Sequence, residues 1–135
     1  MNSYIKLKKK IQSKNIKVGI IGLGYVGLPL SLTISERGYT VYGLDKDINK
    51  IKLLCRFKSY IKHVSSPRIK KLVKKKLFIP TDQFNLLEKI DIIILCVPTP
   101  LTKNKKPDLK HIKNSVDLIF KYFKPGKKII LESTT

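Results

Sequence analysis

Apolar residues along the chain fall into short runs, which alternate with stretches where they recur every third or fourth position. The short runs predict β-strands, and the recurring positions predict amphipathic helices. The clearest strand is 91–97, because its apolar run is typical of a buried parallel strand. The predicted strands are 17–21, 40–44, 77–79, 91–97 and 128–132, and the predicted helices are 26–37, 47–54, 67–76 and 108–123.

Five strands that alternate with helices predict an α/β fold built on a doubly wound parallel sheet. In the Rossmann type of this sheet the strand order is 3-2-1-4-5. A full Rossmann sheet usually has a sixth strand, so the domain at 16–135 is expected to be incomplete. Residues 1–15 are lysine-rich, with apolar positions at helical spacing, and are expected to form a basic N-terminal extension.

Composition narrows the class of protein. Hydrophobic residues make up 42% of the 135 residues, which is enough for a packed core. The 29 basic and 9 acidic residues give a net charge of +20, which predicts salt-sensitive attraction to polyanions. Only Arg37, Arg56 and Arg68 are arginines, and this scarcity argues against a specific nucleic-acid reader. A basic polyanion-binding protein is kept as the weakest alternative.

The two cysteines are too few for a disulfide framework, and their spacing is not that of a metal site. No apolar run reaches the ~20 residues that cross a bilayer, and the N-terminus lacks the apolar core of a signal peptide. The expectation is a cytoplasmic protein without a membrane partner or a metal.

A glycine-rich turn is the strongest functional signal. Gly22, Gly24 and Gly27 form a GxGxxG pattern between a predicted strand and a predicted helix. Asp45 follows Gly27 by 18 residues, at the end of the next strand. This context is typical of dinucleotide binding, in which the pyrophosphate lies against the glycine turn and the helix N-terminus. The candidate site includes Leu23, Tyr25 and Val26 within the turn. The alternative is a structural turn that binds no ligand.

Asp45 can accept hydrogen bonds from the ribose hydroxyls and would repel a 2′-phosphate, which favours NAD over NADP. The alternative role for Asp45 is a turn or helix-cap residue. Lys50 lies one turn into the following helix and either faces the adenosine or is solvated. Pro98 and Thr99 follow the fourth strand, where open α/β sheets bind ligands.

Five segments in this order together resemble the UDP-glucose/GDP-mannose dehydrogenase family. They are residues 20–30, 59–63, 94–101, 107–109 and 131–135. The likeness is greatest to the UDP-N-acetylglucosamine 6-dehydrogenase branch. The resemblance implies an oxidoreductase that uses NAD to oxidise the C6 alcohol of a UDP-sugar to a carboxylate, for surface polysaccharide synthesis.

The resemblance also implies roles for single residues. It places Thr99 and Ser133 on cofactor-contacting loops and matches Thr134 to a threonine associated with the catalytic water. The family's nucleophilic cysteine belongs to a later part of its chain, and neither Cys55 nor Cys96 matches it. The chain alone is therefore expected to be inactive.

The remaining alternative is a non-catalytic remnant, or a regulatory partner of an intact dehydrogenase subunit. Homo-oligomerisation, or association with such a subunit, is expected in either case. Phe57 stands where the family usually has a glycine, and it would be strained if the positive φ of that position is retained.

Overall fold

The computed structural model describes residues 2–98, 100–122, 124 and 126–132. In chain order the elements are α1 (Ser3–Gln12), β1 (Lys17–Ile21), α2 (Gly27–Glu36), β2 (Thr40–Leu44), α3 (Ile48–Cys55), α4 (Ser66–Lys74), β3 (Phe78–Thr81), the 3-10 helix η1 (Phe84–Lys89), β4 (Ile92–Leu95), α5 (Lys110–Tyr122) and β5 (Lys128–Leu131).

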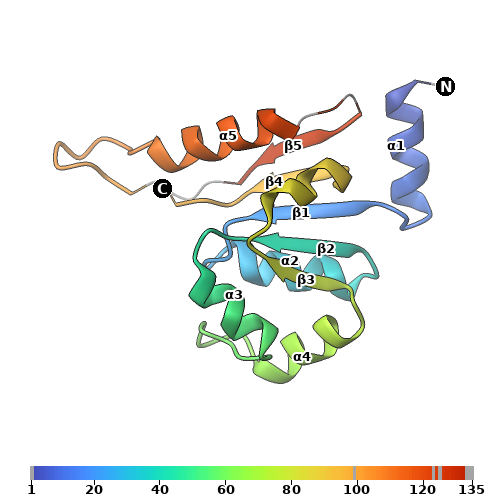
Figure 1. Cartoon of the computed structure of the whole chain (residues 1–135), viewed down its shortest axis with the longest axis horizontal. Coiled ribbons are helices and arrows are strands. Elements are labelled where there is room, and N and C mark those ends of the chain that lie inside the picture. Colours follow the sequence, from blue (N-terminus) through green and yellow to red (C-terminus); the bar gives the residue numbers. More distant parts are fainter. Residues whose placement is uncertain (1, 99, 123, 125, 133–135) are drawn as a thin grey trace.

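The five strands form one parallel sheet in the order β3-β2-β1-β4-β5, which confirms the predicted fold class and strand order. The carboxyl ends of all five strands point to the same side of the sheet, and α1 lies beyond the opposite side, where the strands begin (Figure 1). The glycine turn after β1 is therefore beside the ends of β2 and β4.

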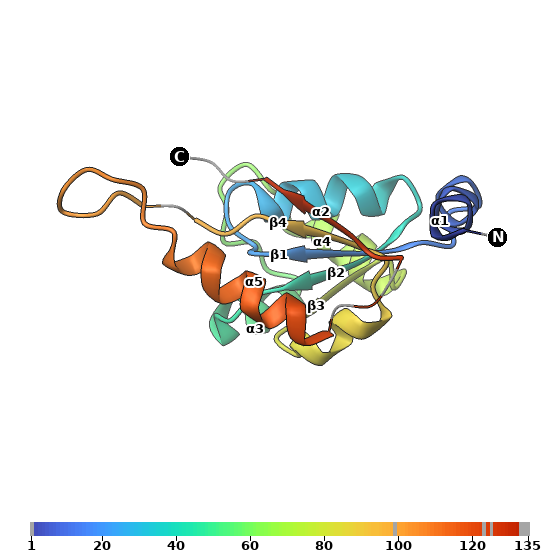
Figure 2. The ribbon, with the colours of Figure 1, turned by 90° about the horizontal axis from the view of Figure 1, so that it is seen from above.

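Side chains of the strands alternate between the two faces of the sheet and pack into two separate hydrophobic cores. Val18, Ile20 and Ile94 belong to the core that contains the buried residues of α2, α3 and α4. Ile21, Ile93 and Leu95 belong to the core that contains the buried residues of η1 and α5. Figure 2 shows α2 and α5 on opposite sides of the strands. Both faces are covered, as expected for a parallel sheet.

Local chemistry explains most element boundaries. Asp47 caps α3 by accepting a hydrogen bond from the Asn49 N–H at 3.0 Å, and Gly38 follows α2 with a φ of +95°. The predicted third strand, 77–79, began one residue too early and ended two residues too soon, because β3 continues through Pro80 to Thr81. Pro80 is tolerated because β3 is an edge strand, where a missing N–H costs no ladder bond. The η1 helix was not predicted.

The helices α1, α3 and α4 end with a non-glycine residue in the left-handed region. Lys14, Phe57 and Lys76 have φ values of +58°, +64° and +58°. Each donates its N–H to the carbonyl three residues earlier, and the residue after it donates to the carbonyl five residues earlier. This is the Schellman pattern, in which glycine usually takes the left-handed position. A positive φ, the condition under which Phe57 would be strained, is therefore present.

Candidate functional site

A cleft of about 540 Å³ lies at the carboxyl ends of β1, β2 and β4. Most of the predicted cofactor residues line it, namely Gly22, Leu23, Gly24, Tyr25, Val26, Asp45, Lys50 and Pro98. Gly27 lies behind the turn and does not line the cleft. Thr99, Ser133 and Thr134 lie outside the described residues.

The three glycines of the turn are required for three different reasons. Gly22 has a φ of +98°, and a Cβ there would lie 2.6 Å from the carbonyl oxygen of Cys96. A Cβ on Gly27 would lie 1.6 Å from the carbonyl oxygen of Gly22, so only glycine lets α2 begin this close to β1. A Cβ on Gly24 would meet nothing within 4 Å, because that position faces open space. The fold needs Gly22 and Gly27, whereas Gly24 keeps the turn accessible.

The turn offers hydrogen-bond donors at the N-terminus of α2. Val26 is the N-cap residue of α2 and makes no side-chain capping bond. Among the described residues, none accepts a hydrogen bond from the backbone N–H of Gly24, Tyr25, Val26 or Gly27. Free N–H groups and the positive end of a helix dipole form a site suited to phosphate. The turn therefore fits the pyrophosphate of a dinucleotide.

Asp45 contacts the turn directly. Its Oδ2 accepts a hydrogen bond from the Leu23 N–H at 2.9 Å, and its Oδ1 accepts one from the Asp47 N–H at 2.9 Å. A carboxylate has about four acceptor positions, so both oxygens can still accept from ribose hydroxyls. The structure thus shows the turn role of Asp45, and this role leaves acceptor positions on the carboxylate for a ligand. The Lys50 ammonium lies 3.9 Å from Oδ2, at the same rim of the cleft.

Tyr60 is a functional candidate that sequence reasoning missed. Its hydroxyl donates a hydrogen bond to the carbonyl of Leu23. Burial, with smaller contributions from Asp45 and Asp47, raises the pKa of the Tyr60 phenol well above its ordinary value. No local pattern could have identified this contact, because the two residues are 37 positions apart.

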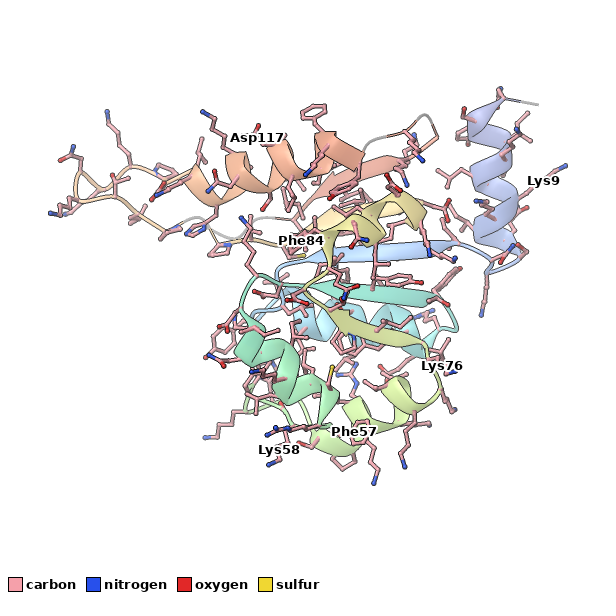
Figure 3. All side chains as sticks on the ribbon, in the orientation of Figure 1. Lys9, Phe57, Lys58, Lys76, Phe84 and Asp117 are labelled. Carbon is pink, nitrogen blue, oxygen red and sulfur yellow. The ribbon has the colours of Figure 1, made fainter. Side chains whose placement is uncertain are left out.

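Part of the cleft wall comes from elements that carried no functional prediction. His111 and Ser115 on α5 line it, and so does Phe84 at the start of η1. Figure 3 labels Phe84, which lies between α5 and the sheet. The lining is completed by Ile21, Lys46, Asp47, Cys96, Val97 and Glu132.

Neither cysteine is arranged as a nucleophile. Cys96 is buried at the end of β4, and its burial, together with the charge of Glu132, raises the pKa of its thiol to about 11. Cys55 is exposed near the end of α3 and lies outside the cleft lining. In the described part of the chain, no three His, Cys, Asp or Glu side chains gather to hold a metal ion. Within that same part, no helix is long and apolar enough to cross a bilayer.

The curated relatives of the chain include proteins named as dehydrogenases of N-acetylated UDP-sugars. The UDP-N-acetyl-D-mannosamine dehydrogenase of Methanococcus aeolicus is 34% identical over 135 residues, covering 96% of this chain and 30% of its own length. The UDP-N-acetyl-D-glucosamine 6-dehydrogenase of Pseudomonas aeruginosa is 34% identical over 123 residues, covering 90% of this chain and 28% of its own length. The chain thus spans less than a third of the relatives that it matches.

Solved structures agree with these relatives. The NDP-N-acetyl-D-galactosaminuronic acid dehydrogenase of Methanosarcina mazei Go1 superposes with a TM-score of 0.82 at 29% identity, over 100% of this chain and 30% of that one. The GDP-mannose dehydrogenase of Pseudomonas aeruginosa gives a TM-score of 0.82 at 28% identity, over 87% of this chain and 28% of that one.

The model of the UDP-glucose/GDP-mannose dehydrogenase family's NAD-binding domain matches residues 16–135, a range that contains the glycine turn, Asp45 and all five strands. The chain therefore belongs to the UDP-glucose/GDP-mannose dehydrogenase family and carries its NAD-binding domain.

Proposed function

We propose that this chain is the cofactor-binding part of an enzyme that oxidises the C6 alcohol of a UDP-N-acetylhexosamine, such as UDP-N-acetylglucosamine, to the uronate. The observation that carries the proposal is the glycine turn with free N–H groups beside Asp45, in a domain of this family. The relatives named for UDP-N-acetylmannosamine and UDP-N-acetylglucosamine support the substrate class. These two sugars are epimers, so both belong in the assay.

The chain's own residues would bind and orient the cofactor. The N–H groups at the start of α2 would hold the pyrophosphate, and Asp45 would accept the hydrogen bonds of the adenosine ribose. Lys50 lies at the same rim and would face the adenosine, while Pro98 borders the cleft beyond β4. NAD supplies the hydride acceptor for the oxidation at C6.

Three of the proposed roles belong to residues outside the described part of the chain. We propose that Thr99 and Ser133 contact the cofactor from the ends of the fourth and fifth strands, and that Thr134 acts near the catalytic water. The nucleophile would come from a segment corresponding to the remaining length of the relatives. We also propose a cytoplasmic location. The reasons are that the domain binds NAD and that the exposed Cys55 is a free thiol, which is typical of a reducing compartment.

Titration with NADH, followed by nucleotide fluorescence, tests the binding part of the proposal. Saturable binding of NADH, with weaker binding of NADPH, is the expected result. Asp45→Ala is expected to weaken NADH binding about tenfold and to remove the preference over NADPH, because the ribose hydroxyls lose a charged acceptor. Asp82→Ala is the matched control, because Asp82 follows β3 at the same edge but does not line the cleft.

Absence of NADH binding by the wild-type chain would refute the proposal. The substrate part is tested by NADH formation from NAD with UDP-N-acetylglucosamine or UDP-N-acetylmannosamine. The assay is run with the chain alone and with a polypeptide corresponding to the rest of the Methanococcus aeolicus relative. Turnover is expected only in the second case. Turnover by the chain alone would contradict the assignment of the nucleophile to the segment that corresponds to the rest of the relative.

A further inference from the structure

We propose that Tyr60 is a positioning residue for the cofactor, because its hydroxyl holds the Leu23 carbonyl and thereby aims the Gly24 N–H into the cleft. This inference rests on the proposed function, since it concerns the same phosphate-binding turn. It adds a residue from the segment 59–63, which contributed to the family resemblance but was given no role in the site.

The peptide unit between Leu23 and Gly24 is held from one side. A trans peptide is planar, so its C=O and N–H point in opposite directions. The Leu23 carbonyl accepts the hydrogen bond of the Tyr60 hydroxyl. The Gly24 N–H must therefore point away from Tyr60. Gly24 itself lines the cleft, and a Cβ at this position would meet nothing within 4 Å.

The preceding peptide unit is held by a different side chain. The Leu23 N–H donates to Asp45 at 2.9 Å, and the Gly22 N–H donates to the Leu44 carbonyl at 2.8 Å. The Leu23 side chain is fully buried in the core shared with α2. Rotation of the Leu23–Gly24 peptide is then the main freedom left to the turn at this point, and the Tyr60 hydrogen bond opposes it.

The loop that carries Tyr60 is built to resist movement. Ser59 donates its N–H to the Ser66 hydroxyl at 3.0 Å and its own hydroxyl to the Ile61 carbonyl at 2.8 Å. Ile61 and Val64 are buried in the same core as Leu23. Tyr60 is thus fixed on both sides along the chain.

One further contact keeps the phenol in place, and the burial of the phenol keeps it able to donate. The Lys50 ammonium lies 5.7 Å from the centre of the Tyr60 ring, within the range of a cation–π contact. Burial raises the pKa of the phenol, so its hydroxyl remains a donor at every pH at which the protein would work.

The test separates positioning of the phosphate donor from general support of the fold. Tyr60→Phe keeps the ring and removes the hydroxyl. Tyr39→Phe is the matched control, because the Tyr39 hydroxyl also donates to a backbone carbonyl, that of Ile11 at 3.4 Å, but at the opposite end of the sheet. Both variants are titrated with ADP-ribose, which contains the pyrophosphate, and with adenosine, which does not.

For Tyr60→Phe, ADP-ribose affinity is expected to fall about tenfold while adenosine affinity stays at the wild-type level. Tyr39→Phe should match the wild type for both ligands. In a Gly24→Ala background, Tyr60→Phe should cause no additional loss, because the donor that it positions is already blocked. Unchanged ADP-ribose affinity, or equal losses for both ligands, would overturn the inference.

A measurement on the wild-type chain covers the case in which Tyr60→Phe does not fold. In amide NMR spectra, the Gly24 resonance should shift on addition of ADP-ribose and remain in place with adenosine. A Gly24 resonance that ignores ADP-ribose would overturn the inference. If the wild type binds neither NADH nor ADP-ribose, the proposed function itself fails, which is a distinguishable result.

Discussion

The contrast between Gly24 and Gly27 gives the sharpest prediction, because the same added methyl group should damage binding at one position and folding at the other. In Gly27→Ala, the new Cβ would lie 1.6 Å from the Gly22 carbonyl oxygen, and α2 would have to move away from the turn. Such overpacking costs about 3 kcal/mol. For a chain of this length about 1 kcal/mol corresponds to roughly 3 to 4 °C, so the melting temperature should fall by about 10 °C.

In Gly24→Ala, the new Cβ meets nothing within 4 Å, and no positive φ opposes the substitution. The free energy of unfolding of the free protein should therefore change by less than about 0.5 kcal/mol. The methyl group would occupy the space that the pyrophosphate needs. A loss of about 2 kcal/mol of binding free energy corresponds to roughly 30-fold weaker NADH binding.

Thermal denaturation without ligand and NADH titration measure the two effects separately. Gly24→Ala should keep the wild-type melting temperature and lose affinity, whereas Gly27→Ala should lose stability first. Wild-type NADH affinity in Gly24→Ala would refute the placement of the pyrophosphate against this turn. A wild-type melting temperature in Gly27→Ala would refute the close contact between the two glycines.

Three further predictions concern stability and reactivity. Lys76→Gly should raise the free energy of unfolding, measured by chemical denaturation, by about 0.5–1 kcal/mol. The reason is that the exposed Lys76 (Figure 3) has a φ of +58°, where a residue with a Cβ is strained and glycine is not. A lower stability of the variant would contradict this. Arg68 lowers the pKa of Glu36, so above the ordinary Glu pKa of about 4.3 their exposed ion pair should stabilise the fold by at most about 0.5 kcal/mol. This stability advantage over the Glu36→Gln variant should disappear as the pH falls through the lowered pKa of Glu36. An advantage that persists in acid would be inconsistent with the ion pair. A thiol reagent at neutral pH should modify the exposed Cys55 and spare Cys96, because Cys96 is buried and the pKa of its thiol is about 11. The labelled peptides are identified by mass spectrometry, and equal labelling of the two cysteines would disprove the prediction.

The sequence predicted the fold well because its signals are local. Strand–helix alternation, the Asp47 cap and Gly38 depend on residues within a few positions of one another. The errors also have local causes. Pro80 resembles a strand breaker until the strand is known to lie at an edge, and η1 is too short to show a helical period.

The candidate site was predictable only in part. The GxGxxG spacing and Asp45 identified the turn and its acidic partner, because this motif is confined to one strand–turn–helix unit and the next strand. His111 and Ser115 could not be placed in the cleft from sequence, because their position depends on how α5 packs across the sheet.

By itself, the sequence determined that this chain forms a parallel sheet with a dinucleotide-type glycine turn, because hydrophobic periodicity and glycine spacing act within single elements. Only the tertiary structure decided how the turn is held. The Asp45 carboxylate accepts a hydrogen bond from the Leu23 N–H, and the Tyr60 hydroxyl donates one to the Leu23 carbonyl. These bonds join segments 22 and 37 positions apart. Such contacts exist only once strand order and packing bring distant backbone groups within hydrogen-bond distance.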